Sequence, residues 1–214
     1  MKTWNAVFKE RKWGEYGFHV LYEYLVTSGW ASRAEKEHIR VLELGCATGA
    51  TTKQLADVGF CVFAVDGAPE AIRQAKLKLD GLSNVYLYCC DFKDLHRRFK
   101  PEFFDLVIDV CALQHNRFGQ TCTIVDRVQG LMKPGAIFWS MMIADGTTRD
   151  IYADLPYTHF ATKRDVIAIF GNLKPVYTDE YIRSLRGAQS IHWLICCENT
   201  KRMSDGKNDD RDEA

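Results

Sequence analysis

A turn of small residues and a carboxylate about twenty positions after it have the types and spacing of a nucleoside-binding site. The turn reads Gly-Cys-Ala-Thr-Gly over residues 45–49, and no large side chain there would keep backbone N–H groups from a ligand. Asp66 ends the next apolar run, where a carboxylate can accept hydrogen bonds from two ribose hydroxyls. Together these groups predict that the chain binds a nucleoside.

Alternating strands and helices would position these groups. Apolar runs predict strands near 39–44, 60–65, 84–90, 103–110 and 136–142, and helical spacing predicts helices near 50–58, 69–80 and 118–132. Such alternation is typical of an α/β fold, in which a largely parallel, doubly wound sheet is covered by helices on both faces. Asp66 then follows the second strand of the sheet.

The glycine spacing discriminates between nucleoside cofactors. A dinucleotide fingerprint would place glycine at positions 45, 47 and 50, but positions 47 and 50 are alanine and the second glycine of the turn is Gly49. The segment Glu43-Leu44-Gly45-Cys46-Ala47-Thr48-Gly49 instead resembles the Glu-x-Gly-x-Gly-x-Gly pattern of class I S-adenosylmethionine-dependent methyltransferases. Ala47 departs from this pattern, because alanine is penalised at the positive φ angle that glycine adopts freely.

The resemblance continues in order along the chain. Residues 60–68 resemble the ribose strand and its turn, 88–92 the third strand and its acid, 104–113 the fourth-strand motif, and 131–138 the Leu-x-Pro-Gly-Gly turn before strand five. The chain is therefore similar to small-molecule methyltransferases of the Methyltransf-11/25 type. This resemblance implies a three-layer, Rossmann-like sheet of about seven strands that is mostly parallel and ends in an antiparallel hairpin.

The resemblance also implies a cofactor, S-adenosylmethionine, which leaves as S-adenosylhomocysteine. The implied cofactor-binding residues are Glu43, Gly45, Cys46, Ala47, Gly49, Asp66, Gly67, Ala68, Asp91, Phe92 and Asp109. In the family, the acid at Asp91 reads the adenine amino group, although an acid there can also cap a helix. Phe92 lies along the adenine or enters the core. Glu43 organises the turn or approaches the methionyl ammonium through water, and Asp109 lies near the methionine or is structural.

Two histidines are candidates for a general base, which methyl transfer needs only when the acceptor arrives protonated. His115 lies on the loop after the fourth predicted strand, and His159 lies in the insert after the fifth. Either histidine can instead have a purely structural role in its loop.

The acceptor pocket is expected from the segments outside the generic cofactor half. Its candidate residues are Trp13, Tyr16, Arg149, Tyr152 and Trp193. Trp13 and Tyr16 can close over the cofactor, since aromatic faces stabilise cations, or they can anchor the first helix. A small-molecule acceptor is expected, such as a sugar or another hydroxylated metabolite, with O-, N- and S-methylation all open.

Composition limits the partners. Lys+Arg and Asp+Glu number 28 each, so no overall positive field would attract a nucleic acid. We find neither a membrane-spanning run nor a secretory segment. Most cysteines fall in predicted strands, where reduced thiols pack as small hydrophobes: Cys61, Cys89, Cys90, Cys111, Cys196 and Cys197. We expect a cytoplasmic monomer or homodimer that uses no metal.

One methyltransferase domain is expected over residues 1–200. It comprises an N-terminal helical lid at 1–38, a cofactor-binding core at 39–142 and a substrate insert at 143–165. Helical spacing runs from Trp4 to Trp30 and again over 162–170, and two strands at 176–184 and 190–198 are joined by a loop at 185–189. Residues 201–214 are charged, and we expect them to be disordered.

Three rival functions stay open. A nucleic-acid methyltransferase often carries Asn/Asp-Pro-Pro-Tyr/Phe after strand four, but this chain has Asp109-Val110-Cys111-Ala112 there. An arsenite-type enzyme would gather cysteines, yet the adjacent pairs Cys89-Cys90 and Cys196-Cys197 would point to opposite sheet faces. A non-catalytic S-adenosylmethionine-binding module that acts through a partner would bind the cofactor without turnover.

Overall fold

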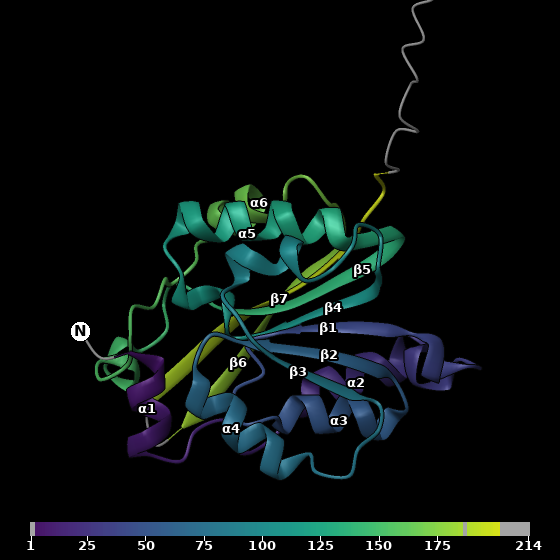
Figure 1. Ribbon diagram of the computed structural model, residues 1–214. Coiled ribbons are helices and arrows are strands. Elements are labelled where there is room, and N and C mark those ends of the chain that lie inside the picture. The colour runs from purple at the N-terminus through teal and green to yellow at the C-terminus, as the bar shows by residue number, and fades with distance from the viewer. Residues whose placement is uncertain (1–2, 186–187, 202–214) are drawn as a thin grey trace, which may run out of the picture.

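A seven-stranded sheet between two layers of helices forms the centre of the molecule in the computed structural model, which describes residues 3–185 and 188–201 (Figure 1). The strand order is β3-β2-β1-β4-β5-β7-β6. The strands are β1 Arg40–Leu44, β2 Cys61–Asp66, β3 Val85–Cys89, β4 Phe104–Val110, β5 Met132–Ile143, β6 Lys174–Leu185 and β7 Ala188–Glu198. Strands β1 to β5 pair in parallel, whereas β7 is antiparallel to β5 and β6. The predicted fold class, including the C-terminal hairpin, is confirmed.

Helices cover both faces of this sheet (Figure 1). Helices α2 (His19–Thr27), α3 (Ala50–Val58) and α4 (Pro69–Lys78) pack on one face, and α5 (Phe118–Leu131) and α6 (Lys163–Phe170) pack on the other. The short 3-10 helices are η1 Trp30–Ser32, η2 Lys36–His38, η3 Phe92–Arg97, η4 Leu113–His115 and η5 Arg149–Tyr152. Helix α1 (Trp4–Glu10) lies at the carboxyl ends of the parallel strands, on the left in Figure 1.

The central strands are buried on both faces, which explains their near-continuous apolar sequence. Leu42 and Leu44 of β1 pack toward α5 and α6, whereas Val41 packs toward α2 and α3. In β5, Phe138 and Trp139 are both fully buried and face opposite sides. Because burying a large apolar side chain contributes about 1.5–3 kcal/mol, these strands hold their carboxyl ends, and the loops that follow them, in fixed positions.

The N-terminal segment differs from the single helical stretch expected between Trp4 and Trp30. It forms α1 and α2, and the intervening residues 11–18, which we call the strap, are not helical. Gly14 of the strap has a φ of +66°, and its carbonyl accepts a hydrogen bond from Thr48 Oγ1 at 2.7 Å. The helical pattern therefore breaks where the chain crosses the turn that follows β1.

Other expected boundaries shift by small amounts. Strand β5 begins at Met132 rather than at residue 136. Met132 pairs with Phe104 and Ile137 pairs with Leu106, so the register shifts between these two pairs, and this shift accommodates the Lys133-Pro134-Gly135 turn. Cys90 and Cys111 lie just beyond β3 and β4 instead of inside them, and all eight cysteines are free thiols. The predicted loop at 185–189 lies partly outside the described residues, as does almost all of the predicted tail at 201–214.

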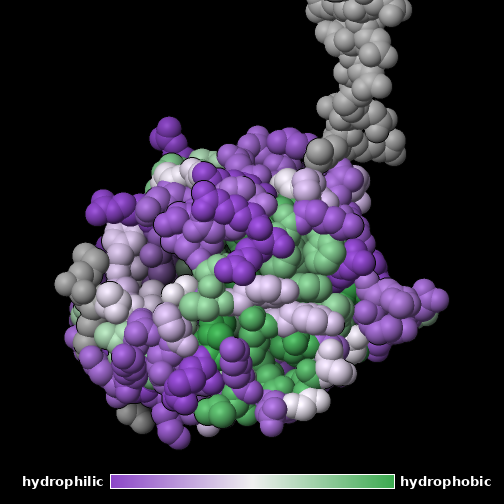
Figure 2. All heavy atoms as spheres, viewed as in Figure 1, coloured by the Kyte–Doolittle hydropathy of each residue, from purple (hydrophilic) through white to green (hydrophobic). Residues whose placement is uncertain are grey.

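Figure 2 shows polar side chains over α5 and α6, and apolar side chains on the side where β3 forms the sheet edge. Tyr86 of β3 and Leu77 of α4 are among the exposed apolar residues. Within the described ranges, no helix combines the length and apolar character needed to cross a membrane.

Candidate active site

A cleft of about 940 Å³ opens at the carboxyl ends of the parallel strands. The loops after β1, β2, β3 and β4 line it, together with α1, the strap and the β6–β7 hairpin. All predicted cofactor residues except Gly49 and Asp109 belong to this lining: Glu43, Gly45, Cys46, Ala47, Asp66, Gly67, Ala68, Asp91 and Phe92. The fold therefore brings together residues that are distant in the sequence.

The turn after β1 is held by β2. The N–H groups of Gly45 and Cys46 both donate to the Val65 carbonyl, at 2.8 and 3.0 Å. Gly45 has a φ of +73°, and a Cβ at this position would overlap the Cβ of Ala112 in the loop after β4. Glycine thus allows the two loops to meet, and much of the turn's hydrogen bonding is used within the protein rather than offered to a ligand.

Asp66 connects the two loops that follow β1 and β2. Its Oδ2 accepts a hydrogen bond from the N–H of Ala47 at 3.0 Å, and its Oδ1 accepts one from the N–H of Ala68 at 2.8 Å. Burial raises the pKa of Asp66 above its ordinary value, and these two N–H groups partly oppose that effect. Each carboxylate oxygen keeps a second lone pair, so Asp66 can hold both loops and also accept hydrogen bonds from a diol.

Glu43 lies beneath the turn and accepts a hydrogen bond from Thr52 Oγ1 at 2.6 Å. Burial raises its pKa to about 8; the Thr52 hydroxyl opposes this rise and the nearby Asp66 adds to it. The carboxyl group is therefore mainly protonated at neutral pH. A cation that approached Glu43 would favour its ionised form.

Asp109 and Gly49 lie behind the cleft rather than in it. Asp109 is fully buried; it accepts hydrogen bonds from the N–H groups of Ala112 and Leu113 at 3.0 Å and from Ser140 Oγ at 2.6 Å. Burial raises its pKa to about 6. A Cβ at Gly49 would meet the Leu79 side chain. Both residues shape the loops around the cleft from behind.

Asp91 has the capping role that the sequence allowed, and it also lines the cleft. It caps η3 by accepting a hydrogen bond from the N–H of Lys93 at 3.0 Å, and it also lies exposed at the cleft. The ring of Phe92 lies against Gly45 and lines the same cleft. The end of β3 therefore presents a carboxylate and an aromatic ring beside the turn after β1.

His115 lines the cleft and is fixed by its neighbours. Its Nδ1 lies 3.1 Å from the Tyr157 carbonyl, which can only accept a hydrogen bond, so Nδ1 carries the proton. Its ring contacts Trp4 of α1 edge-on, with 4.4 Å between centroids. Burial lowers the pKa of His115 to about 4, although the bond to Tyr157 raises it slightly. At neutral pH the imidazole is uncharged, and its unprotonated Nε2 lies 3.5 Å from the Gln114 side-chain amide nitrogen, which can only donate to it.

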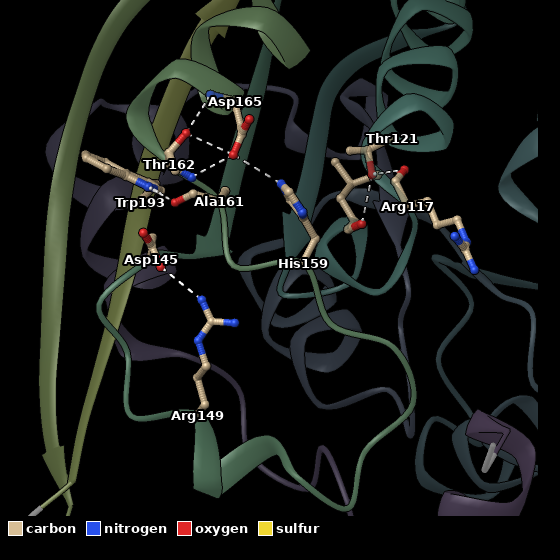
Figure 3. A network of polar contacts seen from close by, with 10 residues as sticks. Arg117, Thr121, Asp145, Arg149, His159, Ala161, Thr162, Asp165 and Trp193 are labelled. Carbon is tan, nitrogen blue, oxygen red and sulfur yellow. Dashed lines mark hydrogen bonds and ion pairs between the residues drawn. The ribbon is translucent and has the colours of Figure 1, made fainter.

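Three predicted site residues lie outside the cleft, in the network of Figure 3. His159 Nε2 is 3.3 Å from Oδ2 of Asp165. The same Asp165 oxygen accepts a hydrogen bond from the N–H of Thr162, the N-cap residue of α6. Arg149 pairs with Asp145 at 3.2 Å, and Trp193 Nε1 donates to the Ala161 carbonyl at 2.8 Å. These three side chains hold the insert after β5. Trp13, Tyr16 and Tyr152 do line the cleft.

Comparison with known proteins identifies this arrangement. The model of a methyltransferase domain family matches residues 35–182. The chain belongs to the class I S-adenosylmethionine-dependent methyltransferases. A methyltransferase of Synechocystis sp. without an assigned activity is 32% identical over 99 residues, which cover 46% of this chain and 44% of the relative. Nodulation protein S of Bradyrhizobium diazoefficiens is 34% identical over 86 residues, 40% of each chain.

The matched segment thus spans less than half of the length of either curated relative. Among solved structures, the N-methyltransferase NodS of Bradyrhizobium japonicum WM9, in complex with S-adenosylhomocysteine, superposes with a TM-score of 0.67. It is 20% identical, and the match covers 86% of this chain and 87% of that one. At this identity, the likeness shows a shared fold.

The cleft also contains residues that the sequence did not single out, chiefly on the β6–β7 hairpin: Tyr181, Arg183, Ser190 and His192. A signal for them exists in the chain. They occupy alternate positions of the two predicted strands, and side chains at alternate positions share one face of a sheet. Cys111 also lines the cleft, at a φ of +59°.

Ala47→Gly should stabilise the protein. Ala47 has a φ of +50°, as expected for the middle position of the turn, and this conformation costs a non-glycine residue about 1–2 kcal/mol. The larger entropy of unfolded glycine offsets roughly 0.5–1 kcal/mol of this gain. We expect the melting temperature to rise by up to ~2–4 °C in calorimetric unfolding.

The matched control for this substitution is Ala168→Gly, at an exposed position of α6 with helical backbone. Glycine there should lower stability by about 1 kcal/mol. Equal destabilisation by the two substitutions would show that the backbone at Ala47 is not strained.

Proposed function

We propose that this methyltransferase acts on a small-molecule acceptor, such as a sugar or another hydroxylated metabolite. The observation that carries the proposal is the second half of the cleft. There, hydroxyl and imidazole groups of Tyr152, Tyr181, Ser190 and His192 line the same space as Asp66 and the turn after β1. The volume of about 940 Å³ is within the range of small-molecule sites.

The cofactor half fits S-adenosylmethionine. Asp66 would bind the ribose, Asp91 and Phe92 the adenine, and Glu43 with the Gly45–Ala47 turn the methionine. Gly45 has no Cβ, so the turn can pack directly against Ala112 in the loop after β4. This close packing supports the assignment. When bound, S-adenosylmethionine supplies a methyl carbon on a positively charged sulfur, which an acceptor atom displaces in line.

The protein's own residues then have three tasks. The turn and the hairpin hold the two reactants in line, which is the main source of acceleration in such a displacement. Helix α1 and the strap cover the cleft and exclude water, with Trp4 against His115 and Trp13 against Trp4 at 5.9 Å between centroids. His115 Nε2 can accept the proton that a hydroxyl acceptor releases.

The charges around the cleft favour a small molecule over a nucleic acid. The lining contains the cations Lys12 and Arg183, together with the acids Glu15, Glu43, Asp66 and Asp91. This balance gives no basic groove of the kind that binds phosphodiester backbones. The whole chain is likewise neutral at pH 7, with 28 basic and 28 acidic residues.

Calorimetric titration with S-adenosylmethionine, S-adenosylhomocysteine and NAD tests the cofactor assignment. We expect micromolar binding of the two adenosyl ligands and no heat with NAD. A panel of nucleotide sugars, small amines, thiols and a short RNA, assayed for S-adenosylhomocysteine formation, then tests the acceptor. Turnover on the RNA alone would overturn the small-molecule proposal. Cofactor binding without turnover on any acceptor would favour a binding module that acts through a partner.

A further inference from the structure

The polar side chains of the β6–β7 hairpin form a group that methyl transfer as such does not require. The register pairs Tyr181 with His192 and Arg183 with Ser190, and opposite residues of an antiparallel pair share one face of the sheet. All four side chains line the cleft, as does Tyr152 of η5. We call these five residues the hairpin cluster.

Hydrogen bonds connect three members of the hairpin cluster. The Tyr152 hydroxyl lies 3.2 Å from Ser190 Oγ, which lies 3.5 Å from His192 Nε2. His192 is 3% exposed, and its Nδ1 has no hydrogen-bond partner among the described residues. Leaving a buried polar group unsatisfied costs about 1–3 kcal/mol, so the unpartnered Nδ1 of His192 lowers the stability of the fold.

Arg183 supplies the charge of the hairpin cluster. Its positive charge acts on three cleft residues. It adds to the lowering of the His192 pKa by burial, and it opposes the rise that burial causes in the pKa values of Cys111 and Tyr152. No carboxylate of residues 3–185 or 188–201 forms an ion pair with it. Its guanidinium carbon lies 5.9 Å from the centroid of the Phe18 ring. The acids of the cleft lie elsewhere, on the strap and in the cofactor half.

We propose that the hairpin cluster binds an oxyanion of the acceptor, a carboxylate or a phosphate, with Arg183 as its cationic partner. A planar guanidinium matches both groups and forms charge-assisted hydrogen bonds with them. The hydroxyls of Tyr152 and Ser190 provide neutral donors beside it. The inference rests on the proposed small-molecule acceptor and makes that acceptor anionic. Arg183 is then a residue that determines specificity.

Binding of matched probes to the protein saturated with S-adenosylhomocysteine tests this site. Benzoate should bind about tenfold more tightly than the isosteric neutral benzamide, measured by NMR titration. Arg183→Gln, which keeps hydrogen-bond donors but removes the charge, should abolish this preference. Arg149→Gln is the matched control, because Arg149 lies outside the cleft and pairs with Asp145. Inorganic phosphate in the same titration shows which oxyanion is preferred.

The outcomes separate this inference from the proposed function. Equal binding of benzoate and benzamide, no binding of either anion, or a preference that survives Arg183→Gln would overturn the oxyanion site. In each case, normal binding of S-adenosylhomocysteine would leave the methyltransferase assignment intact. Failure of the wild-type protein to bind S-adenosylhomocysteine would instead contradict the proposed cofactor site. Unchanged affinity for S-adenosylhomocysteine in Arg183→Gln shows that the variant is folded.

Discussion

Replacing Asp66 with alanine should weaken the binding of S-adenosylhomocysteine by about tenfold or more, equivalent to ~1.4 kcal/mol. The variant lacks the carboxylate proposed to bind the ribose hydroxyls, and a hydrogen bond to a charged group contributes about 1.5–3 kcal/mol. It also leaves the N–H groups of Ala47 and Ala68 without their acceptor, which loosens both loops. Isothermal titration calorimetry of the two proteins measures the difference directly.

A second variant separates these two effects. Asp66→Asn can still accept one of the two N–H groups, so the loops retain part of their connection, but the charge is lost. If ribose binding is the main role, Asp66→Asn should lose almost as much affinity as Asp66→Ala while melting closer to the wild type.

Asp57→Ala is the control for Asp66, since Asp57 forms an exposed ion pair with Lys53 on α3 and lies outside the cleft. It should bind S-adenosylhomocysteine as the wild type does. Unchanged affinity in the Asp66 variants would remove Asp66 from the ribose site.

The positions of the proposed cofactor-binding residues could be predicted from the sequence because the signals are local. The turn and Asp66 each follow directly from an apolar run, and a parallel sheet brings the ends of neighbouring strands to one edge. Glu43, Gly45 and Asp66 therefore lie where the spacing placed them. Asp109 shows the limit of this reasoning. The end of β4 is correctly located, but the side chain turns to the N–H groups of Ala112 and Leu113 and away from the cleft.

The acceptor half was harder to predict because it depends on tertiary pairing. The sequence predicts Arg149 as an acceptor-binding residue and His159 as a candidate base, but Asp145 and Asp165 engage them outside the cleft. The cation that does line the cleft is Arg183, whose position depends on how β6 registers against β7. That register is fixed across the sheet, by pairing with β5, and is not contained in any one segment.

Two of the four non-glycine residues with positive φ angles in the described part of the chain line the cleft. Ala47 and Cys111 both have positive φ angles; they lie just after β1 and β4, the two central parallel strands. Strain of this kind costs of order 1–3 kcal/mol per residue and is held in place by the surrounding core. The loops that would position cofactor and acceptor are therefore rigidly determined, which suits a reaction that depends on alignment.

His115→Asn should lower the rate of methyl transfer by about 100-fold or more if His115 is the general base, because such groups contribute roughly 10²–10⁴-fold. The asparagine amide can still donate to the Tyr157 carbonyl in place of Nδ1, so the loop is retained. It offers no basic nitrogen in place of Nε2. The affinity for S-adenosylhomocysteine should stay within roughly threefold, since the ribose and adenine contacts are untouched.

His159→Asn is the control for His115, because His159 pairs with Asp165 outside the cleft, and it should leave turnover unchanged. The best acceptor from the panel serves as substrate for both variants. Near-normal turnover in His115→Asn would make His115 a structural residue of its loop and would favour an acceptor, such as a thiolate, that arrives without its proton.

The pH dependence gives an independent test of the same role. A base works in its neutral form, and burial lowers the pKa of His115 to about 4, so kcat/KM should be level from neutrality to about pH 5 and fall as the pH passes through 4. Unfolded histidine takes up a proton near pH 6.5, which is above the folded pKa of both His115 and His192. These two histidines therefore contribute less to folding stability as the pH falls below about 6.5, whereas the raised pKa values of Glu43 and Asp109 act in the opposite direction. Circular dichroism must confirm that the protein stays folded at each point. A rate that falls already at pH 6.5 in folded protein would assign the essential base to a different group.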